Sequence, residues 1–432
     1  KVDLLALKSD NDLLAKPELL EKLLTVLKDH EMPPVDEPPL PEATRTQMVV
    51  PLQMMLREAL KNQPFEPTQI RRMNRFQYNN AVVDLLELDR DIFRLNERLM
   101  RRRDDYFRPE TKKMPDQIKV SSRPLSKDID NQRPEGFKGV ASFPQDKRSE
   151  HGFDNRADHL TLSPLLMESF LKLSQTIVES PDLNPKECRS WKWLFAPPDQ
   201  SAGGPAIDTE KTAMRSRLKK LLRRGFRRPV DPETFDRFAK FAEDQLASGA
   251  SFEQMMRTMV GAVLGMPDFL YIYETPDQES SGFKDQGRQR INDFELAARL
   301  AQFFWSSIPD DALLDLAESG KLSAPTTLSA QIDRMLNDRR SSRFCDNFPA
   351  QWLQLERLIT SVPDPKKFAY FYHGDGYRAS MHMMAEPLLL FETLYIEDRS
   401  VMELLDPKFT WESNMLHANY AGKAGAHDLS VQ

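Results

Sequence analysis

Helix start signals recur along this chain and constrain its fold more than any other feature. A residue type that caps helices stands before an apolar stripe at four places, Ser163, Asp231, Ser251 and Asn292. Proline follows the first two directly, while Gln or Glu stands three residues after the last two, which is capping-box spacing. Strand signals are few. The pattern predicts an all-α, multi-helix protein, with two to four helical units joined by long Pro-rich or polar arms.

Composition narrows the function classes. The 432 residues include 31 Pro but only 16 Gly, and neither GxGxxG nor GxxxxGK[ST] occurs, which disfavours phosphate-cradling folds. A net charge of −6 argues against a nucleic-acid binder. Charges interrupt every apolar run before the roughly 18 residues of a membrane span, so we expect no transmembrane segment. Cys188 and Cys345 stand far apart without a CxxC, which indicates no thiol-based metal or redox site.

Proline runs and losses of periodicity predict the domain organisation. We expect a first unit at 1–63, a helical unit at 64–205, a three-helix unit at 206–283 and a C-terminal helical unit at 284–432. In the second unit, Thr68 is the predicted N-cap of a helix that begins near residue 70. An irregular arm at 104–150 follows. More than forty residues without secondary structure are uncommon in a compact protein unless they are functional or docked.

Met32 is the first candidate site residue. It stands in the sequence DHEMPP, just before a proline-rich acidic run. A thioether in a rigid Pro-flanked loop is the form in which a cytochrome c offers its sixth ligand to haem iron. That protein also needs a CxxCH to attach haem, and this sequence contains none. On the residues alone, a proline-rich linker with an incidental methionine is therefore the favoured interpretation.

A second candidate site is the polar stretch ahead of the helix at Ser163. Asp154, Asn155 and Asp158 lie between His151 and His159, so a small oxygen-rich cation site is one interpretation. The spacing matches no EF-hand loop. Asp, Asn and Gly are also the ordinary residues of a turn before a helix, and a turn is the favoured interpretation.

Basic clusters and paired carboxylates have structural explanations. The basic groups are Arg71, Arg72 and Arg75, then Arg101, Arg102 and Arg103, then Lys219, Lys220, Arg223, Arg224, Arg227 and Arg228. We expect them to pair with acidic residues of this chain, or with an acidic protein, rather than with nucleic acid. Asp310 and Asp311 follow Pro309 and are expected in the first turn of a helix. No GxSxG or SxxK nucleophile motif occurs.

Four segments in order carry a family resemblance. They read RRMNRFQYNNAVVDLL, LRRGFRRPVDPETFDRF, MVGAVLGMPDFLY and DFELAARLAQFFWSSIPDDALLDLAESGKL. From about residue 62 onward the chain resembles large exported proteins of planctomycetes and related bacteria, in which a cytochrome-c-like domain precedes several domains of unknown function. The resemblance implies that residues 1–63 are a remnant of the cytochrome domain without its CxxCH, and that Met32 is its axial methionine. The chain resembles a part of the family's length.

The resemblance implies export to the periplasm or cell envelope and association with haem c in the full-length protein. Three functional hypotheses follow. The leading one is a helical scaffold that partners a haem c domain, with electron transfer or docking of a redox partner. The second is a structural or assembly subunit with a vestigial haem site, whose arm at 104–150 wraps a neighbour. The third and weaker one is a carbohydrate-active enzyme or other hydrolase that uses carboxylates the sequence does not identify.

Overall fold

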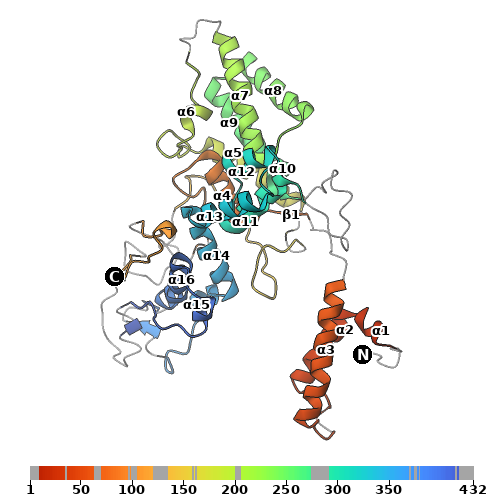
Figure 1. Ribbon diagram of the computed structural model, residues 1–432. Coiled ribbons are helices and arrows are strands. Elements are labelled where there is room, and N and C mark those ends of the chain that lie inside the picture. The colour runs from red at the N-terminus through yellow and green to blue at the C-terminus, as the bar shows by residue number, and fades with distance from the viewer. Residues whose placement is uncertain are drawn as a thin grey trace. The chain divides into compact units, whose positions relative to one another are not determined.

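Helices dominate the computed structural model, as Figure 1 shows. The structure describes residues 9–34, 37–62, 70–95, 98, 105–119, 135–157, 160, 163–199, 206–273, 291–368, 371–373, 377–378, 380–413 and 416–417. Its contacts divide the chain into two compact units. Unit 1 comprises Lys1–Thr68 with Pro276–Arg290, and unit 2 comprises Gln69–Thr275 with Ile291–Gln432. The predicted boundaries within residues 64–432 stay predictions.

The described residues of unit 1 form helices α1 (Asp10–Leu14), α2 (Pro17–Lys28) and α3 (Glu42–Asn62). Pro17 occupies the first position of α2, where its missing N–H would have had no partner in any case. Leu20, Leu24 and Leu27 recur at spacings of four and three and are buried, which places them on one face of α2. Helix α3 packs against α2.

Unit 2 contains the remaining elements. Its first part comprises β1 (Arg71–Arg72), α4 (Arg75–Leu86), the 3-10 turn η2 (Pro109–Thr111), α5 (Pro164–Glu179), α6 (Trp191–Leu194), α7 (Ala206–Phe226), α8 (Pro232–Ala247), α9 (Phe252–Gly265), α10 (Pro267–Leu270) and β2 (Tyr271–Ile272). Its second part comprises α11 (Asp293–Trp305), α12 (Asp311–Glu318), α13 (Pro325–Leu336), η5 (Arg339–Ser341), α14 (Ser342–Trp352), α15 (Glu356–Thr360), β3 (Tyr372–His373), β4 (Tyr377–Arg378), α16 (Ser380–Glu397) and η7 (Val401–Leu404).

The all-α prediction is confirmed, because the strands of the described residues are only two residues long. Strand β1 pairs antiparallel with β2, with Arg71 opposite Ile272, and β3 pairs with β4. Among the helices that the structure describes, none is both long enough and apolar enough to cross a lipid bilayer.

The four predicted caps are confirmed. The side chains of Ser163, Asp231, Ser251 and Asn292 each accept a hydrogen bond from the backbone N–H three residues later. The start predicted for the first helix of unit 2 is wrong. That helix, α4, begins at Arg75 and is capped by Asn74, because the backbone of Arg71 and Arg72 pairs with β2 instead. Thr68 lies outside the described residues.

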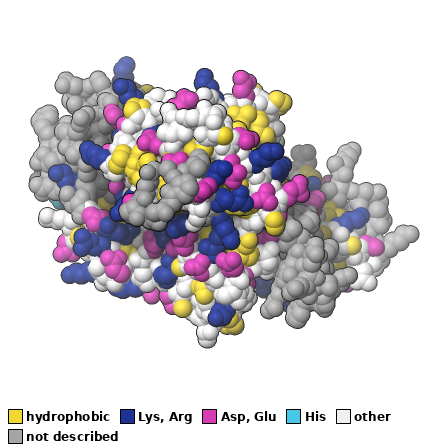
Figure 2. All heavy atoms as spheres, turned by 90° about the horizontal axis from the view of Figure 1, so that it is seen from above, with side chains coloured by type: hydrophobic (Ala, Val, Ile, Leu, Met, Phe, Trp, Pro, Cys, Tyr) yellow, Lys and Arg dark blue, Asp and Glu magenta, His cyan; other side chains and the backbone are white. Residues whose placement is uncertain are grey.

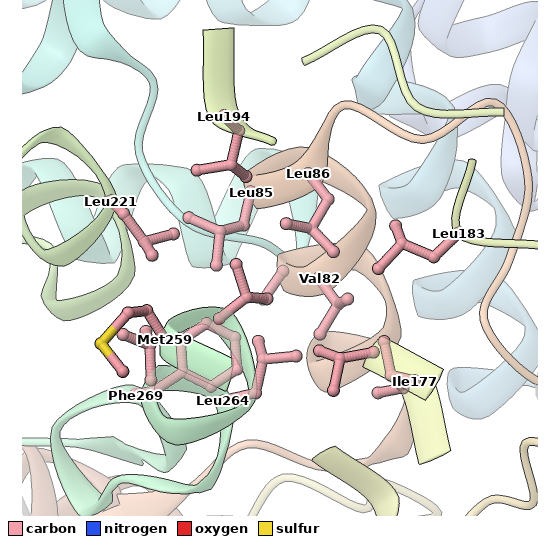
Figure 3. Close-up of a cluster of buried hydrophobic side chains, with 14 of the residues drawn as sticks. Val82, Leu85, Leu86, Ile177, Leu183, Leu194, Leu221, Met259, Leu264 and Phe269 are labelled. Carbon is pink, nitrogen blue, oxygen red and sulfur yellow. The ribbon is translucent and has the colours of Figure 1, made fainter. Parts of the chain in front are cut away.

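The largest core of unit 2 gathers apolar side chains from α4, α5, α7 and α9. Figure 3 shows labelled members pointing toward one another, among them Val82, Leu85, Ile177, Leu221 and Met259. Helices α5 and α9 approach closely because α9 carries glycine at the contact. A Cβ at Gly261 would lie 3.3 Å from the Cγ2 atom of Val178.

The described parts of the 104–150 arm pack on their own chain. Residues 105–119 and 135–150 are irregular apart from η2. Tyr106, Phe107, Met114 and Ile118 are buried in a second core with α14 and α16. Phe137 and Phe143 belong to the largest core. Both described parts of the arm therefore pack against other residues of unit 2.

Candidate functional site

Met32 lies in a loop whose backbone is fixed at the end of α2. The N–H groups of Glu31 and Met32 both donate to the carbonyl of Val26, at 3.0 and 3.2 Å. His30 makes the turn with a φ of 62°. Arg45 of α3 donates from Nη1 to the carbonyls of Leu27 and, at 3.4 Å, of Met32. The arginine thereby ties the loop to both helices of the unit.

The Met32 side chain, in contrast, points to solvent. It is 45% exposed, although its backbone is held from two sides. A neutral, soft sulfur on a fixed backbone fits the requirement for an axial ligand of haem iron. The exposed apolar residues of α3, Met48, Val50, Met54 and Leu60, provide apolar surface in the same unit. Met32 thus fits a distal ligand, while a CxxCH for attachment is not among these 432 residues.

A groove lies between α5 and α9 in unit 2. Its volume is about 1050 Å³, and it is bounded by the end of α5, the following loop, Trp191 of α6 and the first half of α9. Figure 1 labels these helices. The groove exists because α5 ends at Glu179 while the chain turns away through Pro181 and Pro185.

Arg257 of α9 organises one wall of this groove. Its Nε donates to Glu253 at 2.9 Å, and its two terminal nitrogens donate to the carbonyls of Val178 and Leu183 at 2.6 and 2.7 Å. Its guanidinium carbon also lies 5.1 Å from the ring centroid of Trp191. The other carboxylate of the groove, Glu179, accepts a hydrogen bond from Gln175. Each acid is therefore engaged by a neighbouring side chain.

Asp154, predicted with Asn155 and Asp158 as a cation site, lies buried between two amides. Its Oδ1 accepts from Asn74 Nδ2 at 2.8 Å and from Gln351 Nε2 at 2.9 Å. Burial raises its pKa above the usual value, more than these hydrogen bonds and the charge of Arg148 lower it.

Only two of the three predicted cation ligands, Asp154 and Asn155, lie among the described residues. Asn155 is exposed, and Asp158 lies outside the described residues. No group of three or more His, Cys, Asp or Glu side chains that could hold a metal occurs within the described ranges. The cation site stays a prediction, and the observed role of Asp154 is to tie the N-terminus of α4 to α14.

The basic cluster of α7 pairs with acids of the same chain, as predicted. Arg223 binds Asp315 and Glu318 of α12 at 2.7 and 2.8 Å. Arg224 binds Asp311 through Nη2 at 2.7 Å and Glu87 through Nη1 at 2.9 Å. On the face drawn in Figure 2, basic and acidic side chains are interspersed and do not form separate positive and negative patches. Arg101, Arg102 and Arg103 lie outside the described residues.

A stacked cluster around Trp305 escaped sequence reasoning. The guanidinium carbon of Arg340 lies 3.4 Å from the ring centroid of this fully buried tryptophan, and that of Arg334 lies 5.5 Å away. Both arginines bind Asp310, at 2.8 and 3.0 Å. Asp310 is the N-cap of α12 and Asp311 lies in its first turn, whereas the sequence predicted both acids in the first turn. The segment FWSSIPDD marked the tryptophan and the acid, but nothing in it identified the two arginines.

Three family models match separate parts of unit 2. Residues 136–180 match PSD3, a protein of unknown function (DUF1587), and residues 213–274 match PSD5, a protein of unknown function (DUF1595). Residues 291–421 match PSD4, a protein of unknown function (DUF1592). None of the three matches includes residues 1–135. No curated protein and no solved structure matched the chain. The groove between α5 and α9 takes its walls from the PSD3 and PSD5 segments and from the loop between them.

Proposed function

We propose that this protein is a helical scaffold that associates with a haem c group, with Met32 as the distal ligand of the iron. The chain carries the PSD3, PSD5 and PSD4 segments in this order. The observation that carries the proposal is the contrast within the Met32 loop. Val26 and Arg45 hold the backbone, while the thioether stays exposed. A linker with an incidental methionine would not need its carbonyl to be bound by a buried arginine.

Bound haem would supply one-electron transfer. The residues of this chain would position the sulfur of Met32 and cover part of the porphyrin with the apolar side chains of α3. Arg45 holds the loop against α2 and α3. Binding of Met32 to the iron would therefore cost little conformational entropy of the loop. By the family resemblance, we also propose export to the periplasm or cell envelope and binding of protein partners by unit 2.

Absorption spectroscopy tests the proposal directly. The natively purified protein, oxidised and reduced, should show haem c bands, and intact mass should identify the covalently attached group. Met32→Ala should abolish the methionine-to-iron charge-transfer absorption. The matched control is Met402→Ala, since Met402 is an exposed methionine in unit 2. A colourless native protein, or an unchanged spectrum in Met32→Ala, would exclude the proposed ligand.

A second candidate, a structural or assembly subunit with a vestigial haem site, is favoured by an ion pair and a hydrogen bond between the segments of unit 2. Arg224 of the PSD5 segment binds Asp311 of the PSD4 segment, and Asp154 of the PSD3 segment binds Gln351 of the PSD4 segment. Contacts of this kind tie the three segments to one another. A colourless protein that copurifies with a defined set of subunits would select this function.

A further inference from the structure

The groove between α5 and α9 is large enough for a ligand that contains several rings. Its volume of about 1050 Å³ lies just above the range of roughly 300–1,000 Å³ for small-molecule sites. It is open to solvent, so a chain-like ligand can extend beyond it. None of the haem-related residues belongs to it, and its function is a separate question.

The charges of the groove disfavour an anionic ligand. The charged side chains of its lining are Glu179, Glu253 and Arg257. Arg257 is directed toward Glu253 and two backbone carbonyls, so its positive charge is already balanced. A phosphate, a sulfated sugar or a nucleic acid would meet the net negative charge of the remaining carboxylate. The chemistry favours an uncharged ligand.

Side-chain amides give the groove mixed donors and acceptors. They are Gln175, Asn184, Gln245 and Gln254. Gln175 donates to Glu179, which leaves its oxygen as an acceptor. Gln254 accepts from the N–H of Ser251, which leaves its nitrogen as a donor. Gln245 makes no side-chain hydrogen bond to a described residue. A hydroxyl group both donates and accepts, and so matches such a lining better than a purely accepting or donating ligand does.

Trp191 adds one rigid aromatic surface. It is half-buried, lines the groove, and packs against Phe195 at a centroid distance of 4.9 Å and against the guanidinium of Arg257. A ring held in this way presents apolar area with little loss of side-chain freedom on binding. The C–H face of a sugar ring is a flat apolar surface that fits it.

Common peptide-binding modes do not fit this lining. They use a sheet edge, an apolar groove for a helix, several aromatic rings for a proline helix, or an arginine cluster. The described lining contains one aromatic ring, one paired arginine and helix and loop backbone. We propose that the groove between α5 and α9 binds an uncharged oligosaccharide, with Trp191 beneath a sugar ring and Gln175, Gln245 and Gln254 bonded to hydroxyl groups.

Calorimetric titration of the full-length protein with neutral hexaoses tests this proposal. The probes are β-1,4-glucan, β-1,3-glucan, α-1,4-glucan and β-1,4-xylan hexaoses, with a sulfated hexaose and an uncharged hexapeptide as alternatives. At least one neutral hexaose should bind. The double variant Gln175→Ala with Gln245→Ala should weaken that binding by about tenfold or more, because two hydroxyl partners are lost. Gln47→Ala, an exposed glutamine of α3, is the matched control and should change nothing.

Tryptophan fluorescence provides the second measurement. The bound hexaose should change the emission of the wild-type protein, and Trp191→Phe, which keeps an aromatic ring in the core, should remove most of that change. The proposal is overturned by absence of binding to all four neutral hexaoses, by binding of only the sulfated hexaose or the peptide, or by binding that the groove variants leave unaltered. None of these outcomes depends on haem.

Discussion

The carboxylate of Asp84 on α4 binds both terminal nitrogens of Arg343 on α14, at 2.7 and 2.8 Å. Ser307 donates its hydroxyl to the same carboxylate at 2.6 Å. The two charged side chains are only 15% and 11% exposed. Burial pushes the pKa of Asp84 up, but the charge and hydrogen bonds of Arg343, with the charge of Arg340, outweigh it and hold the pKa below its usual value.

Asp84→Asn should destabilise the protein by about 3 kcal/mol at neutral pH, because the change leaves the buried guanidinium of Arg343 without its counter-charge. Chemical denaturation measures the loss. Asp89→Asn is the control, since its pair with Arg189 is largely exposed and should be worth no more than about 0.5 kcal/mol. Because the folded-state pKa of Asp84 is lowered, its contribution is present above the unfolded-state pKa and is lost as pH falls through the folded value. Equal effects of the two substitutions would contradict this ranking.

Asp154 should give the opposite pH dependence. Its pKa is raised by burial, so the native state binds more protons than the unfolded state between the two pKa values. The free energy of unfolding should therefore fall as pH rises from about 3.9 through the folded-state pKa. Asp154→Asn keeps the Oδ1 acceptor for Asn74 and Gln351 and should remove this part of the slope. Asp244→Asn, an exposed position of α8, should leave it in place. An unchanged slope in Asp154→Asn would refute the assignment.

Arg340→Lys should destabilise unit 2 by about 2 kcal/mol, although the charge is kept. An ammonium cannot lie flat on Trp305 while it also binds Asp310 and Asp338. Arg339→Lys alters the neighbouring position, whose side chain is 54% exposed and pairs with Asp105 at the surface, and should change stability by no more than about 0.5 kcal/mol. Thermal unfolding followed by tryptophan fluorescence reports both variants. A stable Arg340→Lys protein would show that stacking on Trp305 contributes little.

Tyr106→Phe should loosen the start of the 104–150 arm. The Tyr106 hydroxyl donates to Glu392 at 2.7 Å in a buried site, and an intramolecular hydrogen bond is worth about 0.5–1.5 kcal/mol. Limited proteolysis should spare residues 105–119 in the wild type and cut them sooner in the variant. Tyr395→Phe removes a hydrogen bond to the Leu336 carbonyl and should not expose this segment. Early cleavage at residues 105–119 in the wild-type protein would argue against the docked arrangement.

Local signals in the sequence predicted the elements of this fold well. Ser251 and Gln254 form a reciprocal capping box in the structure, and this spacing of three positions is visible in the local sequence alone. Helix α4 shows where local reasoning fails. The basic residues Arg71 and Arg72 suit a helix, but the distant segment Tyr271–Ile272 supplies a backbone partner, and tertiary pairing overrides propensity.

The candidate sites were only partly visible in the sequence. Met32 was found because proline and family resemblance mark its loop, whereas the clamp by Arg45 arises from the packing of α3 on α2. The groove had no motif at all. Trp191, Gln175 and Gln254 come from three separate helices, and no spacing in the chain indicates that they share a surface. Asp154 was noticed for its oxygen atoms, but its amide partners could not be read from the sequence.

The pair of Asp84 and Arg343 also bears on the timing of folding during synthesis on the ribosome. The two residues are separated by 259 positions. At about 5–20 residues per second, Asp84 waits roughly 13–52 s for its partner to be synthesised. During that interval α4 has several of its apolar neighbours but lacks the arginine that neutralises its buried carboxylate. The contacts between α4 and α14 can therefore form only after residue 343 has been synthesised, so unit 2 cannot complete its folding as a series of independent N-terminal pieces.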